Sequence, residues 1–569
     1  MNSRKALLDV LLAAGVTSPD AEELAALQPA AGGSWANEVL NSGKVDETKF
    51  TVELARLFHT PFENVEAARI DRQVLQVLPS RFVFKYQILP LSATETTVRL
   101  ATFDVFNLVA RRHAAQQLPG KQIEWVLAAR GPLLRTIKGL YGVGAETFDD
   151  ILASTRTYDS ENRDIAQDIT SDDPEASVVK FVNQIIREAI HERATDIHVE
   201  PLDNDLRIRY RIDGILHEVA VPPQLRVLQS AIISRLKVMA HMDIAERRLP
   251  QDGRINLNTS TGFIDVRVST IPTVNGESIS LRLLSRSETL TFGIERLGMS
   301  DEHVRTVKGL LQQPNGIILV TGPTGSGKST SLYSFLTSIN AVSRRIITIE
   351  EPVEYRLPGV SQIDVKAEIG LTFANGLRAI LRQDPNIVMV GEIRDFETAE
   401  IAIRAAMTGH LVFSTLHTND AVSGITRLLD MGIEPFLLAS VVRCFLAQRL
   451  VRTICPDCKE ETGYPLEYLK EIGVPFPEDM KYYHGRGCEH CRQTGYRGRA
   501  AIYEICVVNE HLRRLVIRKE TGSVMKHRAT KDGMETLRQD GWRRVLLGQT
   551  TIEEVVRVTQ QDEAITQTD

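Results

Sequence analysis

The sequence predicts an α/β fold with several domains, the largest of which holds a mostly parallel sheet. At 569 residues, the chain has room for three or four domains, each with its own core. From about Gly316 onward, short apolar segments alternate with helical patterns, as is typical of parallel sheets. Apolar and polar residues alternate strictly in 206–212 and less strictly in 263–270 and 278–284, which predicts the half-buried strands of a smaller α/β domain.

The region before these strands is predicted to form a separate α/β domain, residues 1–146. Residues 35–57 have the pattern of two amphipathic helices around a turn at Ser42-Gly43. Residues 147–175 are polar and acidic, so we expect a linker there. A helix of clean apolar periodicity then opens the smaller domain at Ala176.

Charge and hydropathy argue against several classes of protein. The net charge of −6 gives no overall attraction for nucleic acid, which needs concentrated positive charge. The most apolar stretch, 436–450, is predicted to be helical, but it is broken by Arg443 and is shorter than the roughly 20 residues of a spanning helix. Residues 1–15 contain Asp9 and leucines at helical spacing, which favours an amphipathic helix over a signal peptide. We therefore expect a cytoplasmic protein that reaches a membrane only through partners.

The strongest motif is a phosphate-binding loop. An apolar strand, 316–320, runs into a predicted helix through Gly322, Pro323, Thr324, Gly325, Ser326, Gly327, Lys328, Ser329 and Thr330. This matches G-x-x-x-x-G-K-[ST] in the strand-to-helix context that the motif requires. The glycines let backbone N–H groups face the β-phosphate, Lys328 reaches the β- and γ-phosphates, and Ser329 supplies a Mg²⁺ ligand. We therefore expect ATP and Mg²⁺ to bind here.

Hydrolysis also needs a polarised water, and polar side chains follow three further apolar segments. Strand 387–390 leads to Glu392, a longer carboxylate than the usual Asp, which we expect to hold Mg²⁺ through water. Strand 345–349 leads to Glu350, Glu351 and Glu354, three candidates for the base that orients water. His417, near the end of strand 409–418, is a candidate sensor of the γ-phosphate, although a lone histidine is as often structural.

Four of the six cysteines form two Cys-x-x-Cys pairs, Cys455 with Cys458 and Cys488 with Cys491. In a cytosolic chain this spacing favours metal over disulfides, and four thiolates close a structural Zn²⁺ site without an open position. Residues 459–487, between the pairs, are longer than the link of a compact zinc ribbon, so we expect an inserted arm at 451–500. Cys444, in the stretch expected to be helical, and Cys506 are predicted core residues.

The phosphate loop, together with segments 349–354, 376–398 and 409–418, resembles the secretion ATPases of bacteria, the hexameric motors of type II secretion and type IV pilus assembly. The resemblance covers the chain from about residue 176 to the end, and residues 1–145 more loosely. It implies a smaller α/β domain at 176–292, a RecA-like core at 293–450 that 501–569 complete, and ATP at their junction. It also implies that Glu392 is the Walker B glutamate, that Glu354 is the general base and that His417 lies near the γ-phosphate.

The resemblance extends to two arginines of the smaller domain. Arg267 and Arg282 match family arginines that move onto the phosphates, where mobile cations can complete the transition-state charge once the domains close. Two positions depart from the family pattern. Glu351 stands where Asp is usual, which keeps the charge, and Thr195 stands where Ser is commoner.

The same resemblance implies partners. We expect a homohexamer on the cytoplasmic face of the inner membrane, docked through residues 1–146 onto the platform proteins of the secretion or pilus system. Some relatives bind cyclic di-GMP in this domain, but Ala6 occupies the likely place of a required arginine and 34–36 open the second helix pair with Ser-Trp-Ala, so that ligand is not expected.

Several functions stay open. The tetracysteine arm is missing from retraction motors, which disfavours pilus retraction. Segments 376–385, 431–440 and 446–459 are closer to the type II secretion ATPases, so we expect a motor that drives pseudopilus assembly, with pilus extension as the alternative. A nucleotide-binding regulator and a nucleic-acid motor are less expected, and no nucleic-acid partner is predicted.

Overall fold

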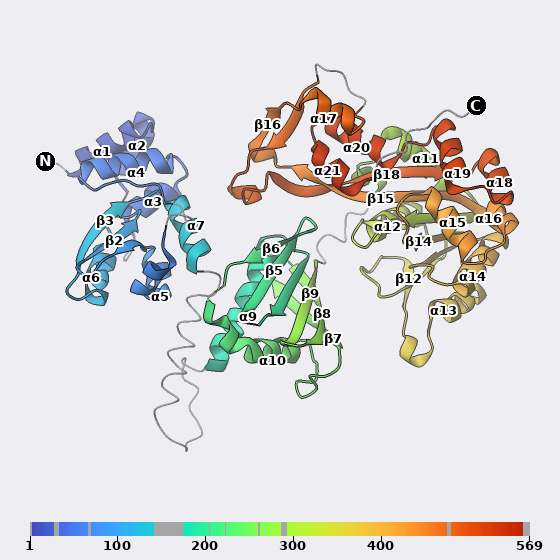
Figure 1. Ribbon diagram of the computed structural model, residues 1–569, viewed down its shortest axis with the longest axis horizontal. Helices are drawn as coiled ribbons and strands as arrows, with labels where there is room; N and C mark the ends of the chain where they lie inside the picture. The colour runs from blue at the N-terminus through green and yellow to red at the C-terminus, as the bar shows by residue number, and fades with distance from the viewer. Residues whose placement is uncertain are drawn as a thin grey trace. The chain divides into compact units, whose positions relative to one another are not determined.

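The computed structural model describes residues 3–27, 34–65, 70–141, 174–203, 205–221, 223–259, 262–285, 293–474 and 480–560. The chain divides into two compact units, residues 1–257 with 264–284, and residues 258–263 with 285–569 (Figure 1). The predicted α/β fold class is confirmed. The predicted linker, 147–175, lies outside the described residues except for Pro174 and Glu175, which begin a helix.

The N-terminal region has a core of its own. Helices α3 (Trp35–Asn41) and α4 (Glu47–Leu57) are the pair predicted from the sequence, and the Trp35 indole donates a hydrogen bond to the Leu24 carbonyl oxygen at 2.9 Å. The three strands have the order β1-β2-β3, with β2 antiparallel to β1 and parallel to β3. The other elements are α1 (Ser3–Ala13), α2 (Ser18–Ala25), η2 (Arg72–Val77), α5 (Ser80–Tyr86), β1 (Leu89–Ala93), β2 (Thr97–Thr102), α6 (Leu108–Gln117), β3 (Gln122–Leu127) and α7 (Arg130–Tyr141).

The smaller domain packs two helices, α9 (Pro174–His191) and α10 (Gln229–Met239), with a sheet of order β6-β5-β4-β9-β8-β7. The predicted alternation is correct in β5 (Leu206–Ile212), where apolar side chains are buried. The arginines on its other face are not free, because Arg207 and Arg209 both pair with Glu200 of β4. The remaining elements are β4 (Asp196–Pro201), β6 (Ile215–Val219), η3 (Pro223–Leu228), β7 (Gln251–Thr259), β8 (Gly262–Thr273) and β9 (Gly276–Ser285).

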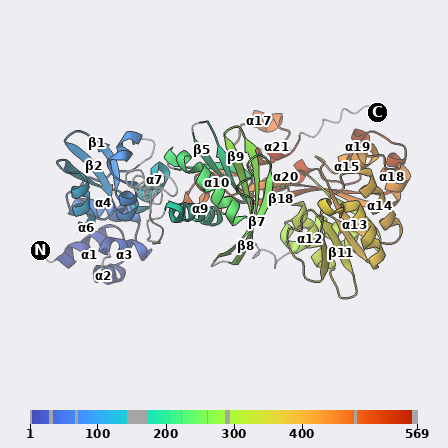
Figure 2. The ribbon, with the colours of Figure 1, turned by 90° about the horizontal axis from the view of Figure 1, so that it is seen from below.

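The second unit is built on a seven-stranded sheet of order β12-β11-β13-β14-β10-β15-β18. The strands from β12 to β15 are parallel and β18 is antiparallel to β15, so the expected mostly parallel sheet is confirmed. Its central strands are buried throughout because helices cover both faces (Figure 2). These strands are β10 (Gly316–Thr321), β11 (Ile346–Glu350), β12 (Val360–Asp364), β13 (Ile387–Val390), β14 (Leu411–Leu416), β15 (Val442–Ile454) and β18 (Tyr496–Val507).

Two apolar cores lie on the two faces of this sheet. Helix α12 (Lys328–Ile339) packs in one of them with Ile318 and Val320. Helices α13, α14, α15, α16, α18 and α19 contribute to the other, with Ile317 and Leu319. Outside the arm, the other elements are η5 (Ile294–Leu297), α11 (Asp301–Leu311), η6 (Ala367–Ile369), α13 (Phe373–Ile380), η7 (Leu381–Gln383), α14 (Phe396–Met407), α15 (Val422–Asp430), α16 (Pro435–Val441), α18 (Glu510–Ile517), α19 (Gly522–Lys531), α20 (Leu537–Leu546) and α21 (Ile552–Val558).

One secondary-structure prediction is wrong. The stretch 436–450 was expected to be helical, but α16 ends at Val441 and β15 follows at once beside β10. Phe445 and Ala447 enter one core and Cys444 and Leu446 enter the other, so both faces of the strand are apolar. A strand buried on both faces has no period-2 signal to separate it from a buried helix. Cys444 and Cys506 are both fully buried, which confirms them as core residues.

The tetracysteine arm is inserted between β15 and β18, which pair over most of their length. It contains η8 (Pro456–Cys458), β16 (Lys459–Thr462), α17 (Leu466–Glu471), β17 (Tyr482–Gly485) and η9 (Glu489–Cys491). Its apolar side chains do not form an isolated core. Leu469 and Tyr482 cluster with Trp542 of α20 and Ile552 of α21, so the arm packs against the C-terminal helices.

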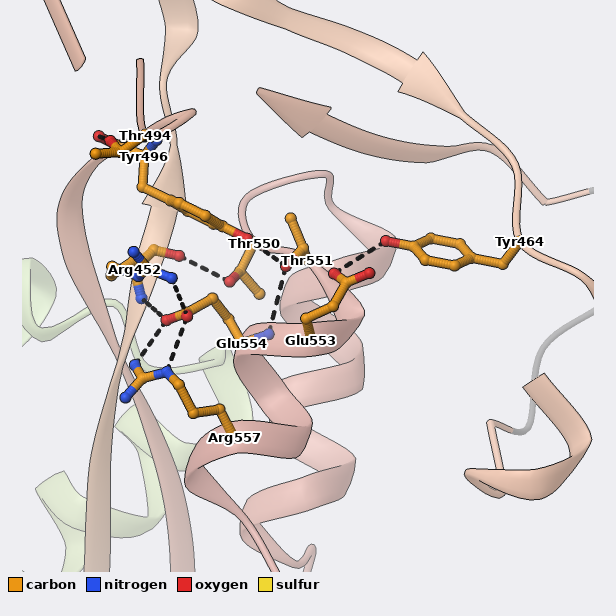
Figure 3. Close-up of polar contacts among 9 residues, drawn as sticks. All are labelled: Arg452, Tyr464, Thr494, Tyr496, Thr550, Thr551, Glu553, Glu554 and Arg557. Carbon is orange, nitrogen blue, oxygen red and sulfur yellow. Dashed lines mark hydrogen bonds and ion pairs between the residues drawn. The ribbon is translucent and has the colours of Figure 1, made fainter. Parts of the chain in front are cut away.

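A polar cluster fastens the same junction (Figure 3). The buried Glu554 carboxylate of α21 accepts hydrogen bonds from Arg452 of β15, at 2.6 Å, and twice from Arg557, at 2.9 and 2.8 Å. Tyr464 of the arm donates to Glu553 at 3.0 Å. Helix α21 therefore binds the sheet and the arm at once.

No helix in the described ranges combines the length and the apolar character needed to cross a bilayer.

Candidate functional site

The phosphate loop lies at the carboxyl end of β10, where parallel sheets place their ligands. Gly322 and Gly327 have φ angles of 150° and 90°, conformations that favour glycine. A Cβ on Gly322 would stand 2.6 Å from the Gln448 carbonyl oxygen, and one on Gly327 would stand 2.7 Å from the Gln448 side-chain nitrogen. Strand β15 thus supports the loop from behind and excludes side chains at both positions.

Lys328 supplies the cation of this loop. Its ammonium group donates hydrogen bonds to the carbonyl oxygens of Gly322, at 2.8 Å, and Pro323, at 3.1 Å. Burial lowers its pKa from 10.5 to about 8, with a smaller lowering by Arg449, while the Glu392 carboxylate opposes the shift. The Lys328 ammonium is thus partly desolvated, and its hydrogen bonds go to neutral carbonyl oxygens. The phosphates of a bound nucleotide would stabilise its positive charge. The loop fits the predicted ligand.

Glu392 stands beside this cation, just past β13. It accepts a hydrogen bond from Arg394 at 2.5 Å, and its other oxygen lies 3.2 Å from His417 Nε2, past β14. Burial opposes the charge of Glu392, but Arg394, assisted by His417, holds its pKa below the ordinary value. The carboxylate is therefore ionised and held in one orientation. A group that binds Mg²⁺ directly or through water needs both properties. The structure brings together Lys328, Glu392 and His417, three of the residues predicted from sequence.

The three carboxylates at and after the end of β11 lie in different environments. Glu350 is buried and accepts hydrogen bonds from Tyr333, Thr348 and Gln362, and burial raises its pKa. Glu351 is exposed and forms an ion pair with Arg394 at 3.0 Å. Glu354 is half-buried, and its backbone N–H donates to the Tyr333 hydroxyl at 3.2 Å. Glu350 is therefore used structurally, which leaves Glu354 and Glu351 as candidates for the base.

The four predicted metal ligands form one cluster. The Sγ–Sγ distances Cys455–Cys488, Cys458–Cys491 and Cys488–Cys491 are all 3.7 Å. Zinc–sulfur bonds of about 2.3 Å in a tetrahedron place the sulfurs about 3.8 Å apart, so the cluster fits Zn²⁺. Burial opposes ionisation of Cys491, but backbone N–H groups of Cys488 and Gly495 donate to its sulfur and hold its pKa near 7. The arrangement suits a closed structural site.

Sequence comparisons agree with this geometry. Residues 171–557 match the family described as "Type II/IV secretion system protein", and residues 58–147 match the MshEN domain.

The chain belongs to the type II/IV secretion system protein family.

The alignments with individual relatives extend over most of this chain. It is 41% identical over 535 residues to the type IV pilus assembly ATPase PilB of Myxococcus xanthus, covering 92% of this chain and 93% of that protein. It is 46% identical over 443 residues to the type II secretion system protein E of Pseudomonas aeruginosa, covering 74% of this chain and 88% of that protein. The solved ATPase DotB of Yersinia pseudotuberculosis shares the fold, with a TM-score of 0.50 at 20% identity over 71% of this chain and 97% of that chain. The predicted enzyme class is confirmed: this secretion system protein is an ATPase.

The two family arginines belong to the other unit of the chain. Arg267 is half-buried on β8, and Arg282, on β9, donates a hydrogen bond to the Asp196 carboxylate of β4 at 3.1 Å. The β9 strand pairs with β4 through Asp196 and Arg282 themselves. Their roles toward phosphate stay predictions.

The sequence analysis did not identify several residues that lie around the nucleotide site. Arg394 bridges Glu351 and Glu392, and it lies within the segment that carried the family resemblance. Gln448 accepts a hydrogen bond from Ser331 of α12 at 2.8 Å, and Arg449 donates to the Asn419 carbonyl oxygen at 2.7 Å. The acidic neighbours of Arg394 in Gly391–Asp395 are a signal that it is paired. No local pattern could identify Gln448 and Arg449, because their segment was expected to be helical.

Proposed function

We propose that this family member is a Mg²⁺-dependent ATPase motor that works as a homohexamer and powers type II protein secretion. Its work would be pseudopilus assembly at the inner-membrane platform, onto which residues 1–146 would dock from the cytoplasmic side. The convergence of Lys328, Glu392 and His417 at the carboxyl ends of β10, β13 and β14 supports the ATPase site. The Pseudomonas aeruginosa relative, a type II secretion protein, supports the pathway.

The residues of the chain divide the chemistry among them. Lys328 would bind the β- and γ-phosphates, and Ser329 and Glu392 would hold Mg²⁺, which when bound would neutralise phosphate charge. Glu354 orients a water and accepts its proton, and His417, held by Glu392, contacts the γ-phosphate. Arg394 keeps Glu392 ionised and in place by its hydrogen bond. Arg267 and Arg282 add positive charge late in the reaction.

Pilus extension is the second candidate. It is favoured by the Myxococcus xanthus relative, a pilus assembly ATPase that matches this chain through its N-terminal region as well as its core. Gene deletion in the source organism separates the two pathways. Complementation with the wild-type gene should restore export of secreted proteins, and Lys328→Ala should not. Restoration of surface pili with unchanged export would replace type II secretion by pilus extension.

A steady-state assay tests the chemistry itself. Purified protein should release phosphate from ATP with Mg²⁺ and stop when the Mg²⁺ is chelated, and Lys328→Ala should abolish turnover and weaken nucleotide binding. Arg344→Ala, a change on the loop before β11, provides a matched cation control and should turn over normally. Wild-type turnover by the Lys328 variant would remove the site assignment.

A further inference from the structure

A second cavity lies behind the phosphate loop, within the same unit. Its volume is about 380 Å³, within the range of small-molecule sites. It is lined by Pro323, Asn419, Asp420, Arg449, Glu504, Lys526, Leu537, Arg538, Arg557, Val558, Thr559 and Gln560. Arg449 lies two residues from Ala447 and from Val451 on β15, so it shares their face of the sheet, which is opposite to α12. The cavity adjoins the phosphate loop, because Pro323 lines it and a Cβ on Gly322 would stand 3.1 Å from Arg449 Nη1, but its other lining residues lie outside that loop.

Arg538 gives the cavity an unbalanced charge. It is the second residue of α20 and is only 6% exposed. Its guanidinium carbon lies 5.4 Å from the centre of the Trp542 ring, and its Nε is buried without a hydrogen-bond partner among the described residues. A buried cation without an anionic partner is unfavourable. This position is therefore prepared for an anion that comes from outside the described residues.

The other charged groups on the wall do not supply that anion. Arg449 donates only to carbonyl and amide oxygens of Gln448 and Asn419, which are neutral acceptors. Lys526 lies 3.7 Å from the Asp420 carboxylate, which balances it. Arg557 is turned to Glu554, as Figure 3 shows. Among the described residues, Arg449 and Arg538 thus form no direct ion pair with a carboxylate, although Asp420 and Glu504 lie near enough to Arg449 to oppose the lowering of its pKa by burial.

Glu504, the remaining carboxylate of the wall, is already bound. Its two oxygens accept hydrogen bonds from the backbone N–H groups of Ala421, at 2.8 Å, and Leu537, at 3.2 Å. Burial raises its pKa to about 7, so part of its negative charge is lost near neutral pH. Leu537 is the residue before Arg538, so Glu504 fixes the start of α20 and thereby the place of the arginine.

We propose that this cavity is a second anion site, which binds a phosphate group through Arg538 and Arg449. A guanidinium presents paired N–H donors that match the oxygens of a phosphate, and a tetrahedral anion can accept from both arginines at once. Asn419, Thr559 and Gln560 supply further polar groups on the wall. The phosphate group can be orthophosphate, the product of the reaction at the neighbouring loop, or part of a phosphorylated small molecule.

The test uses the full-length protein with saturating Mg²⁺ and ADP, so that the phosphate loop is filled. Orthophosphate at constant ionic strength should then raise the melting temperature, because a ligand that binds only the folded state stabilises it. Chloride at the same ionic strength should not. Equilibrium dialysis under these conditions should find about one bound orthophosphate per chain.

Arg538→Met keeps the length of the side chain and removes its charge. It should weaken orthophosphate binding at least tenfold, and without phosphate it should melt no lower than wild type, because an unpaired buried charge is gone. Arg514→Met, a change at an exposed arginine of α18, should leave both properties unchanged. A wild-type protein that binds no orthophosphate under these conditions, or an Arg538→Met variant that binds it equally well, would overturn the proposal.

Two further arms keep the alternatives apart. If Arg538 only packs on Trp542, Arg538→Met should melt lower than wild type and phosphate should not change the wild-type melting temperature. Competition of pyrophosphate and of ribose 5-phosphate with orthophosphate identifies the source: orthophosphate preferred over both points to the reaction product, and a phosphorylated compound preferred over orthophosphate points to a separate ligand. Because ADP fills the phosphate loop throughout, these results do not depend on turnover.

Discussion

Nucleotide binding adds phosphate charge beside Lys328, and this should change how many protons the protein binds. In the free protein, burial lowers the Lys328 pKa to about 8, so the ammonium loses its proton progressively above that pH. Phosphates favour the ammonium and raise the pKa again. ADP binding should therefore take up few protons at about pH 7 and close to one proton at about pH 9.5, and affinity should fall over that interval. Calorimetry in buffers of different ionisation enthalpy measures the uptake, and Lys328→Ala should remove it. Equal uptake at both pH values would contradict this assignment.

Glu392 and Glu354 should separate metal binding from base catalysis. We expect Glu392→Gln and Glu354→Gln to keep ATP binding and to lower turnover by on the order of 10²-fold or more. Glu392→Gln should also raise the Mg²⁺ concentration needed for half-maximal activity, because a metal-side carboxylate is lost, whereas Glu354→Gln should not. Glu368→Gln, on the short helix η6, is a control on the same unit and should behave as wild type. Normal hydrolysis by both variants would remove the carboxylates from the mechanism and leave the phosphate loop intact.

Functional residues that belong to a motif of fixed spacing could be predicted from the sequence. Residues whose role depends on contacts between distant parts of the chain could not. Lys328 and the four cysteines lie in motifs whose spacing is imposed by the ligand itself. Arg394 bridges Glu392 to Glu351, which precedes it by 43 positions and meets it only because β11 and β13 are neighbours in the sheet. Arg538 reveals its significance only through the absence of a partner among the described residues, which is a property of the packed structure.

At the scale of elements, the tetracysteine arm should depend on metal. We expect one Zn²⁺ per chain, and a chelator or Cys455→Ser should unfold the arm while nucleotide binding is retained. Because Leu469 and Tyr482 of the arm cluster with α20 and α21, protection from hydrogen exchange should fall in these helices too. Cys506→Ser, in the sheet, is not expected to change the zinc content. Zinc-free protein with four titratable thiols in the arm would contradict the site.

The Glu554 cluster should be a separate source of stability at the same junction. Burial opposes the charge of Glu554, but hydrogen bonds from Arg557 and Arg452 lower its pKa to about 2. Glu554→Ala leaves Arg452 without its carboxylate and should reduce the free energy of unfolding by about 3 kcal/mol. A carboxylate whose folded-state pKa is depressed contributes stability above its ordinary pKa of 4.5, so the difference from wild type should shrink as the pH falls from there toward about 2. Urea titrations measure it, with Glu553→Ala as the exposed neighbour; equal losses in both variants would contradict the cluster.

The same scale shows which elements a sequence can reveal. Strand β5 was predicted with its bounds because one face is apolar and the other carries arginines. Strand β13 was predicted because it is short and bounded by polar residues. Strand β15 was mistaken for a helix because both of its faces are apolar, and β18 was not recognised as the antiparallel partner that closes the sheet. The sheet order joins strands that are distant along the chain, and local patterns carry no information about such pairs.

For the whole molecule, we expect turnover per subunit to rise steeply with protein concentration as rings assemble. In our proposal, a ring lets one subunit favour the closed state of the next, and closure brings Arg267 and Arg282 to the phosphates. Arg267→Ala and Arg282→Ala should each lower turnover strongly and leave ATP affinity within about tenfold, because their charge is needed most in the transition state. Arg207→Ala, on β5 of the same sheet, is the control. Sedimentation and activity measured over one concentration series test this, and a flat specific activity across assembly would leave a monomeric ATPase.

Strand β15 also connects the phosphate loop to the tetracysteine arm. Gln448 supports the phosphate loop, and β15 ends at Ile454, directly before Cys455. Cys455 follows Gln448 by seven positions along extended chain, a rise of about 23 Å, and β18 runs beside that span, as Figure 1 shows. A displacement of the phosphate loop that pushes on Gln448 would therefore act on a lever whose far end is the tetracysteine arm. A distance probe on the arm would therefore report movement of the phosphate loop from a segment outside the loop itself.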